Sequence, residues 1–327
     1  MSTTASPETW RPTASVSVLR RRARMRGRIR AFFEASDSLE VDTPCLSAAA
    51  PTEPRIEPLE TRVLDRGAWL QTSPEFPMKR LLAAGVGDCW QLARVFRDGE
   101  RGRRHQPEFD LLEWYRLDHD HHELMDEVEA LLVAVLAPER AVPPAERIGY
   151  VDAFRRHVGL DPLEAETADL RAAAADLGAG AVAGLADEDR DAWLDYLLTA
   201  VVLPALPADR PTFVHDWPVA QAALARVHPA DDRLAERFEL FWGELELANG
   251  FHELADPGEQ RARFEAENRT RAARGQPVRP IDEHLLAALE SGLPACAGVA
   301  LGFDRLVMLG AGTAAIDDVV AFPFETA

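Results

Sequence analysis

The segment Phe238–Glu253 constrains the fold of this chain more than any other stretch of its sequence. Two runs rich in apolar residues lie on either side of Trp242-Gly243, which predicts a β-hairpin that turns at these two residues. Such a turn would place Glu239 directly opposite Glu246. Facing carboxylates repel each other unless a cation lies between them, and hard oxygen ligands at a phosphate site suit Mg²⁺. The hairpin therefore predicts a magnesium site, whereas a different register would leave both residues as surface glutamates.

The remaining apolar patterns predict strands near both ends of the chain and helices between them. Strands are expected at Leu39–Pro44, Ala68–Thr72, Cys89–Phe96, Thr212–Trp217 and Gly298–Leu301. Helices are expected at Val16–Glu34, Pro77–Ala84, Glu123–Leu136 and Asp304–Leu309. The Ala/Asp/Glu-rich region from Leu160 to Leu206 is typical of helices, and we interpret residues 155–208 as a helical insertion. This order indicates an α+β fold with a mainly antiparallel sheet flanked by helices.

Length and composition limit the class of protein. A chain of 327 residues with 47% hydrophobic residues can bury one large core, so we expect a flexible tail over residues 1–15 and one domain over residues 16–327. The net charge of -19 repels polyanions over most of the surface, which makes nucleic acid a poor partner. Three scattered cysteines suit a reducing compartment, and no apolar stretch approaches the roughly 20 residues that span a bilayer. We therefore expect a cytoplasmic protein with no membrane partner.

A charged loop follows the strand at Cys89–Phe96. From Arg97 to Phe109 the sequence places two glycines among several cations, which predicts a mobile loop able to fold over a triphosphate. Phe109 offers a flat surface for a base. The loop lacks the glycine and lysine spacing of a P-loop, and no dinucleotide-binding glycine pattern opens a helix. As a lone feature it would also fit an exposed arginine-rich hairpin.

A glycine-flanked strand runs directly into a helix near the C-terminus. Gly302 removes a side chain where a ligand would approach, and Arg305 lies in the first turn of the helix. A cation there opposes the helix dipole unless an anion lies nearby. The pattern favours a phosphate group next to Arg305.

These segments, in this order, resemble the three signature motifs of class II aminoacyl-tRNA synthetases. Pro44, after its helix and strand, resembles motif 1; Phe96-Arg97 through Phe109 resembles motif 2, and Gly302-Phe-Asp-Arg305 resembles motif 3. Further stretches resemble the lysyl subgroup: Thr72-Ser-Pro-Glu75, Met78-Lys-Arg80, Leu112-Glu-Trp-Tyr115, Pro211-Thr-Phe-Val and Asn249-Gly-Phe-His-Glu253. The resemblance runs from about Val16 to Phe322. It implies the catalytic core of a class II synthetase.

Lysyl-tRNA synthetases carry an anticodon-binding domain ahead of this core, and here only a short tail precedes the motif 1 helix. The chain therefore most resembles the freestanding paralogues of lysyl-tRNA synthetase that modify translation elongation factor P with (R)-β-lysine. This resemblance implies an ATP-dependent ligase that forms an aminoacyl-adenylate from (R)-β-lysine or lysine. It would transfer the aminoacyl group to a lysine ε-amine of elongation factor P, without stable tRNA binding, as a homodimer formed around Pro44.

The resemblance also implies an ATP site. Arg97 would hold the α-phosphate and Arg305 the γ-phosphate as the catalytic residues, and Glu239 with Glu246 would bind Mg²⁺. The other ATP-binding positions would be Asp98, Gly99, Glu100, Arg104, His105, Phe109, Leu247 and Gly302. The family usually has glutamate at the position of Gly99, so either Glu100 replaces it or adenine binds more loosely.

For the amino acid, the resemblance implies a pocket with several carboxylates, suited to a diammonium substrate. Its positions would be Ser73, Pro74, Glu75, Glu113, Tyr115, Asn249, Phe251, Glu253 and Ala300. Glu253 would take the terminal ammonium. Lysyl-tRNA synthetases have glycine at the position of Ala300, whose methyl group would disfavour the α-ammonium of lysine and admit the shifted amine of β-lysine.

Two alternatives remain open from the sequence. One is a truncated lysyl-tRNA synthetase that acylates tRNA with a separate tRNA-binding partner. The other is a synthetase-like regulatory subunit without catalysis. Outside these motifs, Asp118–Glu123 contains metal-ligand residue types, but it opens a helix and is interpreted as a solvated N-terminal turn. Asp187–Asp191 is interpreted in the same way, and the arginines of the first helix as a face that pairs with acidic neighbours.

Overall fold

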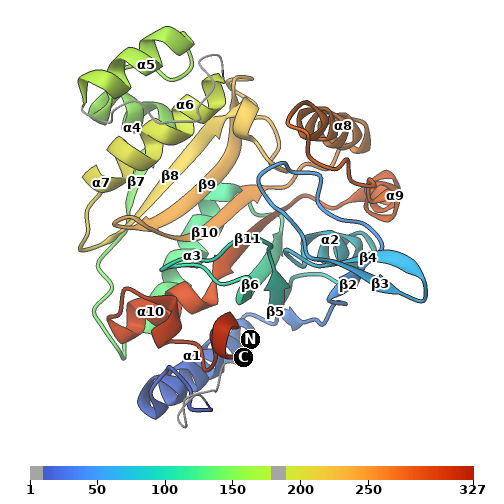
Figure 1. Ribbon diagram of the computed structural model, residues 1–327, viewed down its shortest axis with the longest axis vertical. Helices are drawn as coiled ribbons and strands as arrows, with labels where there is room; N and C mark the ends of the chain where they lie inside the picture. The colour runs from blue at the N-terminus through green and yellow to red at the C-terminus, as the bar shows by residue number, and fades with distance from the viewer. Residues whose placement is uncertain (1–9, 178–188) are drawn as a thin grey trace, which may run out of the picture.

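The computed structural model describes residues 10–177 and 189–327 (Figure 1). An eight-stranded sheet has the order β1-β5-β6-β11-β10-β9-β8-β7. Its strands are β1 Leu39–Glu40, β5 Cys89–Phe96, β6 Glu108–Leu117, β7 Glu146–Gly149, β8 Pro211–Pro218, β9 Leu234–Trp242, β10 Leu245–His252 and β11 Cys296–Gly302. Only the two edge pairs, β1 with β5 and β7 with β8, are parallel. The predicted α+β class with a mainly antiparallel sheet is confirmed.

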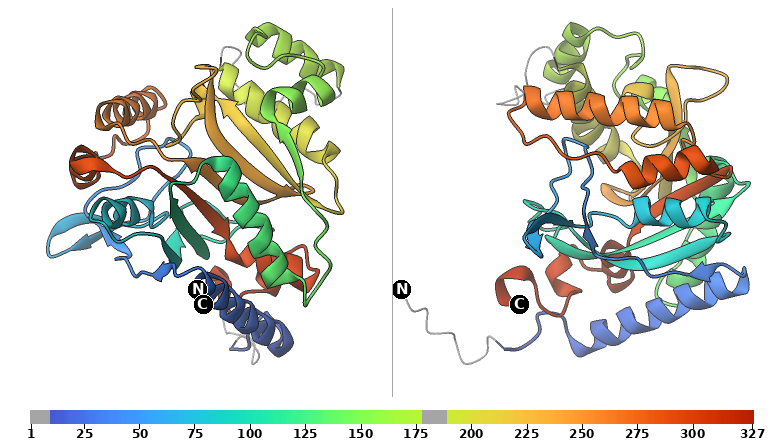
Figure 2. Two further views of the ribbon diagram at one scale, coloured as in Figure 1. Left: turned by 180° about the vertical axis from the view of Figure 1, so that it is seen from behind. Right: turned by 90° about the vertical axis from the view of Figure 1, so that its right-hand side faces the viewer.

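One face of this sheet carries the main core. Helix α3, His121–Leu136, crosses this face in the view from behind (Figure 2) and shares a buried apolar cluster with α1, Val16–Ala35, and α10, Phe303–Ala311. Met25, Ile29 and Phe33 recur every four residues along α1 and are fully buried, as expected for one face of an amphipathic helix. Phe33 stacks on Trp90 of β5 with ring centroids 4.9 Å apart.

The arginines of α1 pair with acidic residues, as predicted. Arg22 is ion-paired with Asp110 of β6 and Asp304 of α10, and the Asp304 side chain also accepts a 2.8 Å hydrogen bond from the backbone N–H of Asp110. Arg28 pairs with Glu139 at 3.1 Å. Because Arg22 contacts both Asp110 and Asp304, it connects the segments that resemble motifs 1, 2 and 3.

The other face of the sheet is bordered by three helices and a small sheet. The helices are α2 Glu75–Ala83, α8 Pro257–Ala273 and α9 Glu283–Gly292, and the small sheet has the order β2 Leu46–Ser47, β4 Arg66–Leu70, β3 Glu60–Val63. The apolar patterns of the sequence do not predict α8, α9, β2 or β3. Among the described helices, none combines the length and apolar character that crossing a bilayer requires.

The region predicted as an insertion, residues 155–208, belongs to a helical unit that has its own core and begins earlier than predicted, at Tyr150. This unit contains α4 Tyr150–His157, α5 Thr167–Asp176, α6 Arg190–Leu197, a π-helical turn at Leu198–Val202 and α7 Leu203–Ala205. These helices pack against Val214 and Trp217 of β8 and Phe241 of β9 (Figure 1). Asp189 caps α6 by accepting from the backbone of Ala192, so this acidic helix start is confirmed where the structure describes it. Asp187 and Glu188 lie outside the described residues.

The predicted hairpin exists, but its predicted register is wrong. Trp242 pairs with Leu245, so the turn is Gly243-Glu244, one residue later than expected, and Gly243 has a positive φ of 57°. A β-bulge between Glu246 and Ala248 then shifts the pairing by a further residue. Glu239 consequently lies opposite Asn249, and Glu246 lies opposite Phe241.

Part of the predicted N-terminal tail is docked on the protein. Residues 1–9 of this tail lie outside the described range. The backbone N–H of Thr13 donates to the Ala321 carbonyl at 3.0 Å, and Ala14 is buried. Ser15 caps α1 by accepting from the Val18 N–H. The described part of the tail is therefore held against the C-terminal segment.

Candidate active site

A cavity of about 440 Å³ opens on the face of the sheet opposite α3. Cross-strand pairing places Glu113 of β6, Ala300 of β11 and Asn249 of β10 in one row. The next row contains Tyr115, Gly298 and Phe251. Because residues directly opposite each other have side chains on the same face of a sheet, these two rows form the floor of the cavity.

Glu113 is buried beneath the cavity and held by two hydroxyl groups. The Ser73 hydroxyl donates to one carboxylate oxygen at 2.6 Å, and the Tyr115 hydroxyl donates to the other at 2.8 Å. Burial raises the pKa of Glu113 to about 8, and the negative charge of Glu75 acts in the same direction. The two hydroxyl groups therefore fix the position of the Glu113 side chain. Its ionised form is unfavourable in this buried place unless a cation lies nearby.

Lys79 forms ion pairs with two other carboxylates of the cavity. It is a site residue that the sequence did not predict. Its Nζ lies 2.7 Å from Glu75 Oε1, one helical turn earlier on α2, and is also ion-paired with Glu253. Burial alone would lower the pKa of Lys79, but the carboxylates of Glu253 and Glu75 outweigh it and raise that pKa above its usual value. Two signals in the sequence pointed to Lys79: its i, i+4 spacing from Glu75 and its place in the stretch Met78-Lys-Arg80, which resembles the lysyl subgroup.

Glu253 keeps one oxygen for a ligand. Burial raises the pKa of Glu253 to about 8 despite the adjacent Lys79. Its Oε1 is buried and has no hydrogen-bond partner in the described part of the chain. A Cβ at Gly298 would lie 2.4 Å from this oxygen and 2.3 Å from a ring carbon of Tyr115. Gly298, which the sequence analysis did not assign to the site, therefore leaves the space in which Glu253 and Tyr115 lie.

Cations surround the other end of the cavity. Arg305, in the first turn of α10, donates to the Glu246 carbonyl at 2.8 Å and lies 2.7 Å from the Nε2 of His105. The guanidinium of Arg97 lies over the Phe109 ring, 5.1 Å from its centroid, and pairs with Glu100 at 3.6 Å. Burial lowers the pKa of His105, and the charge of Arg305 lowers it further. This end of the cavity suits an anion such as a phosphate.

The loop between β5 and β6 is anchored, although the sequence predicted a mobile loop. Arg101 pairs with Glu325 at 2.6 Å and with Asp317 at 2.9 Å. The Gln106 side chain donates to Asp317 at 2.6 Å, and the Ile316 N–H donates to the Arg103 carbonyl at 2.9 Å. Contacts with the C-terminal segment therefore hold the loop beside the cavity.

Most residues predicted for the site border this one cavity. They are Ser73, Glu75, Arg97, Glu100, Arg104, His105, Phe109, Glu113, Tyr115, Glu246, Leu247, Asn249, Phe251, Glu253, Ala300, Gly302 and Arg305. Pro74, Asp98, Gly99 and Glu239 are not among its lining residues. Pro74 is the N-cap residue of α2, and Gly99 takes a positive φ of 74° in the loop.

The predicted pair of metal ligands, Glu239 and Glu246, still interacts electrostatically despite the register error. Burial raises the pKa of Glu239 to about 8, and the charge of Glu246 contributes to this rise. Arg237 donates to the Glu239 carboxylate at 2.5 Å. Two carboxylates of which one is buried are a donor set that fits Mg²⁺.

The arrangement combines an anionic end with a cationic end in one cavity. When they are ionised, the carboxylates of Glu75, Glu113 and Glu253 exceed the charge of Lys79, so this end suits a ligand with more than one ammonium group. Arg97 and Arg305 suit a polyphosphate. A carboxylate held between the two ends would lie near the phosphate, which is the geometry that adenylation requires.

Comparisons with known proteins agree with this arrangement. Residues 8–326 match the family model described as tRNA synthetases class II (D, K and N). The chain is 50% identical over 325 residues to an elongation factor P--(R)-beta-lysine ligase of Klebsiella pneumoniae subsp. pneumoniae, covering 98% of each chain. Proteins with the same name from Salmonella arizonae and Salmonella dublin are 50% and 49% identical over the same length.

Proposed function

The chain belongs to the class II tRNA synthetase family of the D, K and N type, and from this premise we propose that it is an ATP-dependent ligase for elongation factor P. It activates (R)-β-lysine as an adenylate and transfers it to a lysine ε-amine of that protein. One observation carries the proposal. The carboxylates of Glu75, Glu113 and Glu253 lie at one end of a cavity whose other end has Arg97 and Arg305. The relatives' names support both the amino acid and the acceptor.

The first step joins the amino acid to AMP. The substrate carboxylate attacks the α-phosphorus of ATP, a P–O bond forms, and the bond to pyrophosphate breaks. No side chain needs to act as nucleophile, so the protein contributes positioning and charge stabilisation. Arg97 holds the α-phosphate, Arg305 the γ-phosphate, and Arg104 with His105 add positive charge. Phe109 stacks on adenine once Arg97 turns from its ring to the phosphate.

The second step forms an amide. The acceptor amine attacks the carbonyl carbon of the adenylate, loses a proton, and AMP leaves. Glu253 holds the terminal ammonium through its free Oε1, whereas Ser73 and Tyr115 fix Glu113 beside it. Asn249 and Phe251 complete the pocket. Glu246 with Glu239 would hold Mg²⁺, which neutralises phosphate charge when bound.

We propose in addition that the protein is a cytoplasmic homodimer with an interface around Pro44. Leu39 and Leu46 support this interface because they flank Pro44 and are 52% and 47% exposed. Light scattering on the purified protein measures the mass in solution. A charged substitution, Leu46→Glu, should shift the dimer toward monomer, whereas a wild-type protein that is already monomeric contradicts the interface.

Exchange of labelled pyrophosphate into ATP tests the activation step. (R)-β-Lysine and L-lysine are compared in parallel, and exchange should depend on (R)-β-lysine. If no amino acid supports exchange, the enzymatic proposal is wrong and a regulatory subunit remains.

Incubation with purified elongation factor P, ATP and (R)-β-lysine tests the transfer step. Mass spectrometry should detect the added aminoacyl group on one lysine of the acceptor. Labelled tRNA serves as the competing acceptor, and its acylation in place of elongation factor P would favour a truncated lysyl-tRNA synthetase.

A further inference from the structure

Four side chains with metal-ligand chemistry meet on the face of the sheet that is opposite the cavity. We call them the histidine cluster: His121 and His122 at the start of α3, and His215 and Asp216 on β8. His215 pairs with Phe238, which lies in the core under α3, whereas the neighbouring pair Val214 and Glu239 belongs to the other face. The cluster is therefore separate from the cavity that carries the adenylation site.

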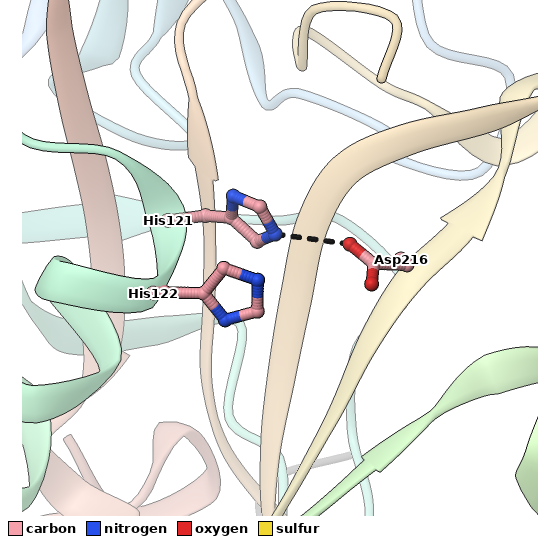
Figure 3. A group of neighbouring side chains, drawn as sticks. All are labelled: His121, His122 and Asp216. Carbon is pink, nitrogen blue, oxygen red and sulfur yellow. Dashed lines mark hydrogen bonds and ion pairs between the residues drawn. The ribbon is translucent and has the colours of Figure 1, made fainter. Parts of the chain in front are cut away.

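The geometry of the cluster is compact (Figure 3). The ligand atoms of His121, His122 and Asp216 all lie within 4.8 Å of one another. His121 Nε2 lies 2.9 Å from one carboxylate oxygen of Asp216, and His215 Nδ1 lies 2.8 Å from the other. The rings of His121 and His122 are 4.1 Å apart, and those of His122 and His215 are 5.2 Å apart. One carboxylate is thus surrounded by three imidazoles.

Local backbone features place the four side chains of the histidine cluster next to one another. The Asp120 side chain caps α3 by accepting from the N–H groups of His122 and Glu123, which fixes the first turn of the helix. On β8, the register shifts between His215 and Trp217, and Asp216 has a positive φ of 57°. Neighbouring side chains in a regular strand point to opposite faces, but this bulge brings His215 and Asp216 together. Aspartate is one of the few non-glycine residue types that tolerate this backbone region, so it permits the bulge at this position.

His122 has an open coordination position. It is exposed, and within the described ranges neither of its ring nitrogens has a hydrogen-bond partner, whereas His121 is 1% exposed and already directed at Asp216. Figure 3 shows the His121 and His122 rings next to each other and facing Asp216. A helix N-terminus disfavours a lone cation, so a metal here depends on the negative charge of Asp216.

The distances fit a small ion with nitrogen and oxygen ligands. Zinc bonds of about 2.0 to 2.2 Å at tetrahedral angles put two ligand atoms roughly 3.3 Å apart. His121 Nε2 and Asp216 would separate slightly from their present 2.9 Å, and the exposed His122 ring would move toward them. His215 donates its Nδ1–H to the second carboxylate oxygen, which is the outer contact that commonly orients a ligating group.

We propose that His121, His122 and Asp216 bind a divalent transition-metal ion, with Zn²⁺ as its reference, and that His215 orients the Asp216 carboxylate. The ion joins the first turn of α3 to the bulge of β8 and takes a water molecule as its fourth ligand. It has a structural role, because the cavity with its phosphate-binding arginines lies on the other face of the sheet.

Metal titration of the chelator-treated protein tests this site. Zn²⁺ binding is followed by calorimetry, and Co²⁺ replaces Zn²⁺ for visible absorption, which is intense for four-coordinate cobalt. We expect one tightly bound ion per chain and an increase in melting temperature on adding Zn²⁺. No tight binding to the wild-type protein overturns the proposal.

Two variants locate the ion without requiring a buried residue to be removed. His122→Ala changes an exposed side chain, and Asp216→Asn keeps a residue type that tolerates a positive φ. Each should weaken Zn²⁺ binding at least 30-fold, abolish the cobalt spectrum and leave pyrophosphate exchange unchanged. His157→Ala, which removes a histidine of α4 outside the cluster, should bind like the wild type. Wild-type affinity in both cluster variants overturns the proposal, even if Zn²⁺ binds elsewhere.

Discussion

Lys79 of α2 and Glu253, the residue that follows β10, form a buried ion pair beneath the cavity, although they lie far apart in the sequence. Lys79 contacts one oxygen of Glu253, and the other oxygen has no partner in the described residues. This pairing fixes the Glu253 carboxylate while leaving half of it available to a substrate ammonium. Lys79 also pairs with Glu75, so one cation offsets the repulsion between the acidic groups of the pocket.

Lys79→Met should destabilise the protein strongly. Removing one partner of a buried pair leaves the other charge unpaired and costs about 3 to 5 kcal/mol. We expect this decrease in the free energy of unfolding at pH 8, with a smaller decrease at pH 5 because the carboxyl groups then take up protons. Urea denaturation measures both values.

An exposed ion pair provides the control for Lys79→Met. Arg30 and Glu40 pair at 3.0 Å with side chains that are 60% and 43% exposed. Arg30→Met should change the free energy of unfolding by less than about 1 kcal/mol. If Lys79→Met costs no more than Arg30→Met at pH 8, Lys79 does not stabilise the pocket as inferred.

Substrate affinity should rise with pH. Without ligand, burial raises the pKa values of Glu113 and Glu253 to about 8 from an ordinary value of 4.5. A carboxyl with a raised pKa in the folded state stabilises the protein below pH 4.5, and this contribution is lost as the pH rises through 8. A diammonium substrate prefers the ionised carboxylates, so its binding releases protons. The dissociation constant for (R)-β-lysine should therefore fall by up to about tenfold per pH unit per proton between pH 6 and 8.

Calorimetry in two buffers with different heats of ionisation counts the protons released in this titration. Glu113→Gln should release fewer protons than the wild type at pH 6.5. If the dissociation constant for (R)-β-lysine is equal at pH 6 and pH 8, Glu113 and Glu253 are not protonated in the empty pocket as inferred.

Gly298→Ala should disrupt the amino-acid pocket. Its Cβ would lie 2.3 Å from a ring carbon of Tyr115 and 2.4 Å from Glu253 Oε1, so both side chains must move. Overpacking of this kind costs about 1 to 3 kcal/mol, and displacement of Glu253 should reduce amino-acid activation by about 100-fold. The matched control is Gly27→Ala in α1, where no atom lies within 4 Å of the new Cβ and where alanine favours the helix by about 1 kcal/mol. Equal activities for the two variants would show that the space at Gly298 is not needed.

Local patterns explain which parts of the fold the sequence predicted. The arginine-rich α1 depends on neighbours in sequence and matches its prediction closely, whereas α3 begins at His121, two residues before the predicted Glu123. Helix α8 was not anticipated, because polar residues dominate it and only Gln260, Phe264 and Arg271 are buried. The hairpin register failed for a related reason. The turn lies one residue later than predicted, and a bulge between Glu246 and Ala248, which leaves no mark in the apolar pattern, shifts the pairs beyond it by a further residue.

Long-range contacts explain what the sequence missed at the two sites. The local sequence around Lys79 is typical of an exposed lysine on a helix. Its burial depends on the ion pair with Glu253, which is distant in sequence. The segment Asp118–Glu123 was interpreted as a solvated turn, which is right for the Asp120 cap. His121, however, is buried, and its partner Asp216 lies 95 residues further along the chain.

Ala300→Gly should widen the choice of amino acid. Ala300 pairs with Glu113 on one side and with Asn249 on the other, so its methyl group lies in the floor row between two polar residues of the pocket. One methyl group in a tight pocket changes discrimination by about 1 to 3 kcal/mol. The kcat/KM for L-lysine in pyrophosphate exchange should rise about tenfold or more relative to that for (R)-β-lysine. If the ratio of kcat/KM for L-lysine to that for (R)-β-lysine is unchanged, Ala300 does not determine the choice of amino acid.

Two arginines of the same strand-loop segment should differ sharply in their effect on adenylation. Arg97 borders the cavity over the Phe109 ring, whereas Arg94 of β5 pairs with Glu108 and Asp110 and is not among the lining residues. If Arg97 stabilises the charge that develops on the α-phosphate, Arg97→Ala should reduce kcat for exchange by about 10² to 10³. Arg94→Ala removes the same charge outside the cavity and should retain activity within a few-fold. A similar loss in both variants would mean that net positive charge around the loop, rather than a positioned contact with the phosphate, supports the reaction.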